Sequence, residues 1–210
     1  MIRIAPLACA LALAAFGFAA APAPMQIPLG QKDVRLATAG IYTLDPNHVS
    51  VEARVPHAGF SISIFRFGRA RATLQWDPSA VAKSKLDATV EIASLITNVA
   101  GFAQQLQGAE YLNAAKYPQA HFVSSAFRRT DAMHGKVTGL LTLMGRTLPA
   151  TFDVTLIGAG PGFAGGPVMG HVIGIHAETS VDANAIGLPP NLLLKTPIVI
   201  AVDTEFDKKG

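Results

Sequence analysis

The sequence contains six histidines, the side chains best suited to metal binding or proton transfer near neutral pH. They form no His-Glu-x-x-His motif and no pair at a helical ligand spacing. His171 and His176 are five residues apart, so on a regular strand they point to opposite faces. His171 shares its parity with Ile173 and Ile175 and is expected to face inward, whereas His176 is expected to face water. We therefore predict structural histidines and no metal site.

A glycine-rich string, GPGFAG at 160–165, matches the spacing of a dinucleotide-binding motif. Its context does not fit, because it lies between two expected strands and Pro167 follows it. No helix begins there to point its N-terminus at a phosphate. We predict a flexible hairpin loop within the Gly-Pro-rich segment 158–167, and no cofactor.

The acidic residues form no visible catalytic pair. Asp45, Asp153 and Asp203 occupy turns or polar strand faces, and no two carboxylates share apolar surroundings that would separate their pKa values. This pattern favours a binding protein over an enzyme and indicates no catalytic residue. Because catalytic groups are assembled in space, a barrel enzyme using His57 or His171 as its base stays open as an alternative.

The longest uncharged stretch precedes a change from helical to alternating pattern. Within 101–113, four apolar residues recur near spacings of three and four and form one helix stripe: Phe102, Leu106, Ala109 and Leu112. Tyr117-Pro118 follows, and a residue before proline disfavours helix, so the helix is expected to end by Lys116. The stripe either caps a core or forms a lid over an apolar cavity.

Most of the remaining chain alternates with period two, which is typical of half-buried antiparallel strands. Val51, Ala53 and Val55, for example, share one face, and Glu52 and Arg54 share the other. Further apolar faces are expected along 86–92, 152–156 and 198–206. The other expected strands are 60–67, 69–76, 121–128, 136–143 and 169–181.

About eight to ten strands with one short helical insertion predict a single all-β domain, either an antiparallel barrel or a sandwich. A closed eight-stranded barrel is just wide enough to be filled by side chains or to hold one small ligand. Small inward residues such as Ala53, Ala72 and Ala88 leave room, whereas Phe67 and Phe152 take it away. A ligand-free structural domain with a filled core therefore stays open.

The first residues have the layout of a secretory signal peptide: Arg3, an apolar run to Phe18, then small residues. The run is shorter than the ~20 residues that a membrane span needs. We predict a cleaved signal over 1–23, a lead-in over 24–40 and a barrel over 41–207. The single cysteine, Cys9, lies in the signal, so we expect no disulfide and no thiolate site. A net charge of only +3, with no dense basic run, argues against nucleic-acid binding.

Three segments together resemble the YceI-like family. The first, YTLDPNHVSVEARVPHAGFS at 42–61, is similar to that family's opening strands. The second, EYLNAAKYPQAHF at 110–122, resembles its helix end followed by Tyr/Phe-Pro and a strand. The third, VTGLLTLMGRTLPATFDVTL at 137–156, is similar to its G-x-L-T-x-x-G-x-T-x-P-V hairpin. The resemblance runs over about 41–206.

This resemblance implies a lipocalin-like barrel in the bacterial periplasm that binds a polyisoprenoid, a quinone-like lipid or another amphiphile. The helix would then cover the tunnel. Family members typically carry Arg-Asp-x-His before this helix end, where the present chain has Phe102-Ala103-Gln104-Gln105. They also carry Arg/Lys-x-x-Phe-Gly late in the chain, in place of the neutral residues at 183–187. Apolar ligand binding therefore carries over better than recognition of a particular head group.

The expected cavity wall combines strand parity with family position, and His57 is its polar contact. The residues are His57, Phe60, Phe67, Trp76, Phe102, Leu106, Leu112, Phe122 and Ile175. The expected partner is an apolar small molecule, with no nucleic acid. A membrane redox protein and a homodimer are further partners that this interpretation leaves open.

Overall fold

The computed structural model describes residues 27–189 and 197–209, so the predicted signal over 1–23 lies outside the described residues. Ten strands and one short α-helix follow a lead-in that carries a 3₁₀ turn, η1 (Val34–Leu36). The strands are β1 (Gly40–His57), β2 (Ser61–Phe67), β3 (Ala70–Trp76), β4 (Lys85–Glu91), β5 (Leu95–Ile96), β6 (Gln119–Arg129), β7 (His134–Leu143), β8 (Arg146–Phe163), β9 (Met169–Val181) and β10 (Ile198–Lys209). The helix is α1 (Phe102–Gln107), and two more 3₁₀ turns are η2 (Val81–Lys83) and η3 (Ile92–Ser94).

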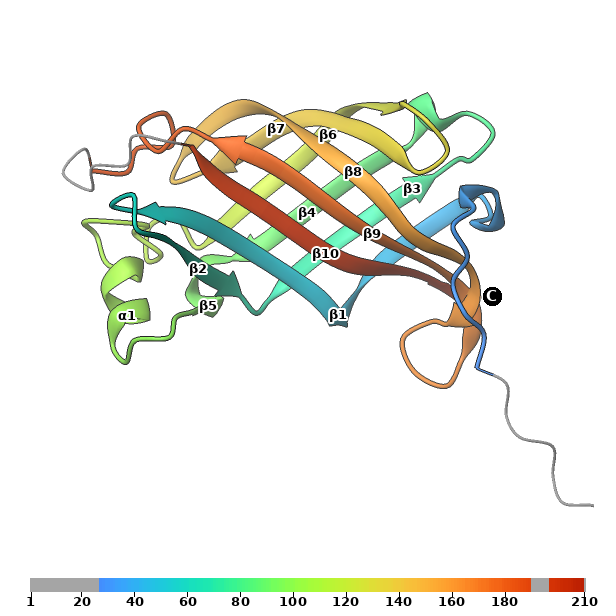
Figure 1. Cartoon of the computed structure of the whole chain (residues 1–210), viewed down its shortest axis with the longest axis horizontal. Helices are drawn as coiled ribbons and strands as arrows, with labels where there is room; N and C mark the ends of the chain where they lie inside the picture. The colour runs from blue at the N-terminus through green and yellow to red at the C-terminus, as the bar shows by residue number, and fades with distance from the viewer. Residues whose placement is uncertain (1–26, 190–196, 210) are drawn as a thin grey trace, which may run out of the picture.

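The strands form a closed antiparallel barrel, which confirms the predicted fold class (Figure 1). Eight strands make the ring in the order β1, β3, β4, β6, β7, β8, β9 and β10, and pairing of β10 with β1 closes it. Closure removes the exposed sheet edges that an open sheet would leave. On its other edge, β1 pairs with β3 through Gly40–Thr43 and with β2 through Val51–His57. β2 and the short β5 therefore extend the wall at one end only.

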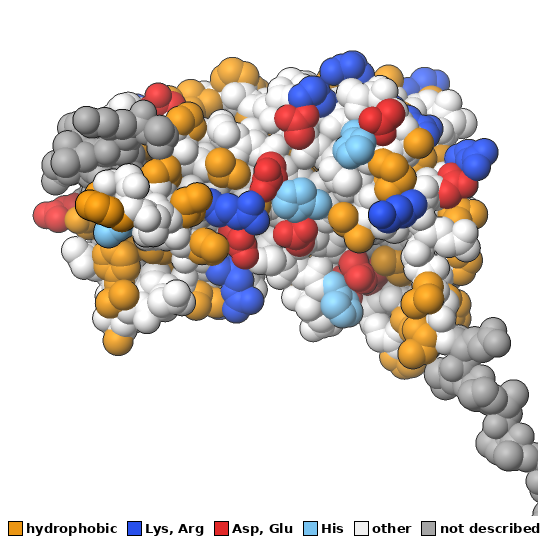
Figure 2. Space-filling model, in the orientation of Figure 1, with side chains coloured by type: hydrophobic (Ala, Val, Ile, Leu, Met, Phe, Trp, Pro, Cys, Tyr) orange, Lys and Arg blue, Asp and Glu red, His pale blue; other side chains and the backbone are white. Residues whose placement is uncertain are grey.

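Alternation along the strands separates an apolar interior from a polar exterior. On β10, Ile200, Val202 and Phe206 line the interior, and Asp203 and Glu205 alternate with them. On the outer face over β1, β9 and β10, acidic, basic and histidine side chains gather (Figure 2). Period-two patterning thus sets both surfaces, as the sequence predicts.

The two ends of the barrel differ (Figure 1). At one, called the packed end here, the lead-in folds over the opening and Gln31 bridges to Ala159. Ala37 and Tyr42 are fully buried in the core cluster at this end, and the Tyr42 hydroxyl donates to the Thr38 carbonyl at 2.8 Å. The other, called the α1 end, carries α1, β5 and the β1–β2 turn.

One local prediction is wrong, and one element is shorter than its pattern suggests. The segment 158–167 is not a loop throughout, because β8 continues to Phe163 and pairs with β9 as far as Met169. Only the residues after Phe163 turn. The helix ends before Lys116, as predicted, but it is shorter than the expected stripe over 101–113, since α1 ends at Gln107. Gly101 precedes the helix with φ 78°, a left-handed conformation that glycine adopts readily because it has no Cβ. Gly108 follows the helix in an extended conformation.

Candidate functional site

The barrel encloses a cavity of about 1210 Å³. Inward side chains of the ring strands line it, together with residues of β2, β5 and α1. Its wall is overwhelmingly aliphatic and aromatic, and it extends from His57 and Val99 at the α1 end to Met133 at the packed end. This volume exceeds the roughly 300–1,000 Å³ of ordinary small-molecule pockets. The interior is therefore hollow, and large residues do not fill it.

Most residues of the predicted wall surround this cavity. Eight of the nine line it: His57, Phe67, Trp76, Phe102, Leu106, Leu112, Phe122 and Ile175. Whether they contact a ligand stays a prediction. Phe60 is not part of the wall, because it lies in the turn between β1 and β2 with a side chain that is 90% exposed. Strand parity did not apply there, since the chain reverses before β2 begins at Ser61.

The helix stripe reaches the cavity although the helix is short. Phe102 and Leu106 project from α1, and Leu112 follows in the turn after it. The Phe102 ring packs against Phe65 of β2, with 6.0 Å between the ring centroids. Gln107 Nε2 donates to the carbonyl oxygen of Ala93 at 3.4 Å. Helix α1 therefore covers part of the cavity, as the lid interpretation requires. The Phe65–Phe102 ring contact and the Gln107–Ala93 hydrogen bond hold it in place.

Polar side chains are few in the cavity lining, and titratable ones lie at both of its ends. At the α1 end, His57 is exposed, and its ring makes no hydrogen bond or ion pair with any described residue, although its carbonyl oxygen accepts from the Phe60 N–H at 2.9 Å. At the other end, Asp131 in the β6–β7 turn accepts from the backbone N–H of Met133 and lies 2.9 Å from His134 Nδ1. These hydrogen bonds lower the pKa of Asp131. The sequence predicted this turn but not its place at the cavity rim.

The two histidines on β9 have different surroundings. His171 is half-buried, with an enclosed Nδ1, but it is not part of the cavity wall. Its parity matches Ile173, yet its position along β9 lies beyond the cavity, beside Lys208 of β10. His176 lies on the outer face and pairs with Asp203 of β10 at 2.8 Å. Neither His171 nor His57 has a carboxylate partner among residues 27–189 and 197–209.

One group of potential metal ligands, which the sequence analysis missed, converges outside the cavity in the described structure: Asp45, His48 and Glu205. Asp45, which was expected at a turn or on a polar strand face, is buried. The sequence contains a local signal, because Asp45 and His48 are only three residues apart. The third ligand, Glu205, comes from the other end of the chain.

No helix in the described ranges is both long and apolar enough to span a bilayer.

Comparison with known proteins gives a consistent result. Residues 42–206 match the model of the YceI-like domain. A UPF0312 protein of Pseudomonas putida (strain W619) is 33% identical over 154 residues, which cover 72% of this chain and 78% of that protein.

Solved structures share the fold. A Campylobacter jejuni YceI protein superposes with a TM-score of 0.64 at 25% identity, covering 75% of this chain and 91% of its own. Burkholderia cenocepacia BcnA gives a TM-score of 0.66 at 20% identity over 79% of this chain and 99% of its own. A polyisoprenoid binding domain from Saccharophagus degradans gives 0.53 at 12% identity, covering 79% and 97%. With the barrel and its hollow interior, the match over 42–206 establishes that the chain belongs to the YceI-like family.

Proposed function

We propose that this protein is a periplasmic binding or carrier protein that holds a polyisoprenoid, a quinone-like lipid or a similar amphiphile in its barrel. The observation that carries the proposal is the continuous apolar cavity of about 1210 Å³. At about 30 Å³ per water molecule in the liquid, this is room for about 40 waters. A cavity of this size with an apolar wall is suited to a hydrocarbon chain. The Saccharophagus degradans domain that shares this fold is a polyisoprenoid binding domain, and this supports a ligand of that kind.

The wall can supply useful affinity without a polar clamp. Burying roughly ten hydrocarbon carbons at about 0.8 kcal/mol each contributes about 8 kcal/mol before association costs. That gross value corresponds to roughly micromolar binding. Helix α1 presents Phe102, Ala103 and Gln105 where the family typically carries Arg, Asp and His. We therefore expect tolerance toward the head group, with His57 as the polar contact at the rim.

The two alternatives fit the geometry less well. A ligand-free structural domain does not require a hollow interior of this size. A general acid–base enzyme needs a positioned partner for its histidine, and neither His57 nor His171 lies beside a carboxylate in the described structure.

The surface beside the α1 end suits a partner. Phe60, Ile62 and Ile64 expose 90%, 62% and 52% of their surface. We propose this apolar strip as the contact surface between two copies of the chain, and a membrane redox protein stays a prediction that is not assigned to this surface. Light scattering during size-exclusion chromatography tests the homodimer, which Ile62→Lys is expected to dissociate.

Native mass spectrometry of the protein purified from its own periplasm tests the carrier function. The expected result is a discrete lipid mass that survives desolvation, and the same fractionation tests both export and cleavage near residue 23. A ligand-free mass that persists after incubation with ubiquinone and with free polyprenols would refute the carrier function.

A further inference from the structure

A wide bulge interrupts β1 at the seam where the barrel closes. Leu44 pairs with Phe206 of β10 and Val49 pairs with Thr204, so residues 45–48 oppose Glu205 alone. Asp45 Oδ1 accepts a hydrogen bond from the backbone N–H of Asn47 at 2.8 Å, which shapes the bulge. Bulges commonly redirect side chains and are frequent beside functional sites.

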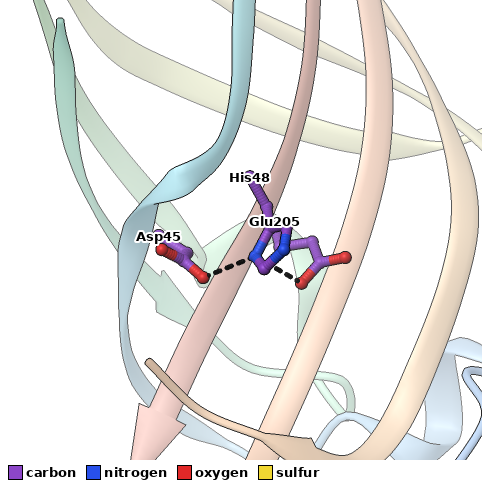
Figure 3. Close-up of side chains that lie close together, drawn as sticks. All are labelled: Asp45, His48 and Glu205. Carbon is purple, nitrogen blue, oxygen red and sulfur yellow. Dashed lines mark hydrogen bonds and ion pairs between the residues drawn. The ribbon is translucent and has the colours of Figure 1, made fainter. Parts of the chain in front are cut away.

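This bulge places the ring of His48 between two carboxylates (Figure 3). His48 Nδ1 lies 2.7 Å from Asp45 Oδ2 and 3.6 Å from Glu205 Oε2. The three ligand atoms all lie within 4.8 Å of one another. Asp45 is only 4% exposed, whereas the His48 side chain is 62% exposed. The cluster therefore has a fixed inner ligand and an open outer side.

A third acid lies beside this cluster. Asp207 is two residues after Glu205 on β10 and therefore on the same face of that strand. It is 6% exposed, and neither of its carboxylate oxygens has a hydrogen bond of normal geometry to any described residue. Three carboxylates thus share a single imidazole as their nearby basic group, which leaves an excess of negative charge.

Another histidine with two acidic neighbours provides a contrast. His176 contacts Asp203 through Nδ1 at 2.8 Å and Glu178 through Nε2 at 3.4 Å. Its carboxylates lie on opposite nitrogens of the ring, so one ion cannot bind all three groups. At His48, both carboxylates approach the same nitrogen.

We propose that Asp45, His48 Nδ1 and Glu205 bind a divalent cation of the Zn²⁺ type, with Asp207 as a buried counter-charge. Imidazole and carboxylate together suit Zn²⁺, which takes nitrogen and oxygen ligands at about 2.0–2.2 Å. Such bonds place tetrahedral ligand atoms about 3.4 Å apart, close to the observed distance between His48 and Glu205. The ion replaces the proton between His48 and Asp45, and it links β1 to β10 at the closure of the barrel. This site is on the outer face and does not depend on the proposed carrier function.

Isothermal titration of the untagged, metal-stripped protein with Zn²⁺ tests this proposal. We expect one ion per chain at micromolar affinity or tighter, with Ca²⁺ binding at least tenfold more weakly. Glu205→Gln and His48→Gln are each expected to weaken Zn²⁺ binding by at least tenfold. His176→Gln is the matched control and is expected to leave the affinity unchanged.

Absence of saturable one-to-one binding by the wild-type protein overturns the proposal, and this result needs no variant to fold. Binding that survives Glu205→Gln but is lost in His176→Gln overturns the assigned ligands. A preference for Ca²⁺ over Zn²⁺ overturns the assigned class of ion. Far-UV circular dichroism of all three variants separates loss of a ligand from loss of the fold.

Discussion

Replacing Ala88 with phenylalanine should block the cavity. Ala88 lies on β4, pairs with Ala72 of β3 and Phe122 of β6, and lines the cavity. Because Ala72 and Ala88 have small side chains, the cavity extends close to the backbone of β3 and β4 here. A benzyl group at position 88 projects into the space that a hydrocarbon chain would otherwise occupy.

The magnitude follows from the ligand carbons displaced. If the ring takes the place of roughly four of them, the loss at about 0.8 kcal/mol per carbon is about 3 kcal/mol. This corresponds to about 200-fold weaker binding. Stability should change little, because burying the new ring contributes about 1.5–3 kcal/mol and overpacking costs about 1–3 kcal/mol.

The single tryptophan provides the assay, because Trp76 lines the same cavity. Ubiquinone quenches indole fluorescence when it binds nearby, so a titration reports affinity directly. Ala126→Phe is the matched control, since Ala126 is exposed on β6 and lies outside the cavity. Equal affinity in Ala88→Phe, Ala126→Phe and wild type would refute the placement of the ligand inside the barrel.

Three further predictions follow from local geometry. Gly139→Ala is expected to lower the free energy of unfolding in urea by about 1–3 kcal/mol, because the added Cβ meets the Val123 carbonyl oxygen of the neighbouring strand; an unchanged midpoint would contradict this packing. The side-chain hydrogen bond from Arg35 lowers the pKa of Asp33 from 3.8 to about 2, so any stability from this carboxylate is present above pH 3.8 and lost as the pH falls through 2. NMR titration of Arg35→Ala is expected to return the pKa toward 3.8, and a value that stays near 2 would exclude the pair as its cause. Phe102→Ala removes an aromatic contact worth about 0.5–1.5 kcal/mol and should speed ligand release by about 2- to 13-fold in stopped-flow quenching, whereas an unchanged rate would mean that α1 does not gate the cavity.

Strand parity, the helix stripe and family position together predicted most of the wall. Alternation determines which side chains share a face, so Phe67, Trp76 and Ile175 were assigned inward before any pairing was known. The prediction for Phe60 was wrong because Phe60 lies in a turn, where side chains do not alternate between two faces. The expected strand 169–181 has the bounds that the structure gives to β9. Alternation in the sequence therefore predicts strand position and side-chain direction well wherever a strand is regular.

Features that depend on distant pairing could not be predicted in this way. A hollow interior requires β10 to close on β1 in one register, and alternation alone is equally consistent with a filled core. The bulge at residues 45–48 is visible only against Thr204 and Phe206 of β10. For the same reason, the sequence alone placed Asp45 at a turn or on a polar strand face and indicated no ligand cluster.

The difference between the two ends indicates where a ligand would enter. At the packed end, opening the barrel would expose Ala37 and Tyr42, which are fully buried, and would break the Tyr42–Thr38 hydrogen bond. At the α1 end, the cover is a six-residue helix, far below the ~12–15 residues at which an isolated helix becomes even marginally stable in water. Its position therefore depends on tertiary contacts such as the Phe65–Phe102 pair, so moving it costs much less than opening the packed end. Entry of an amphiphile tail-first past α1 would leave its head group beside the exposed His57.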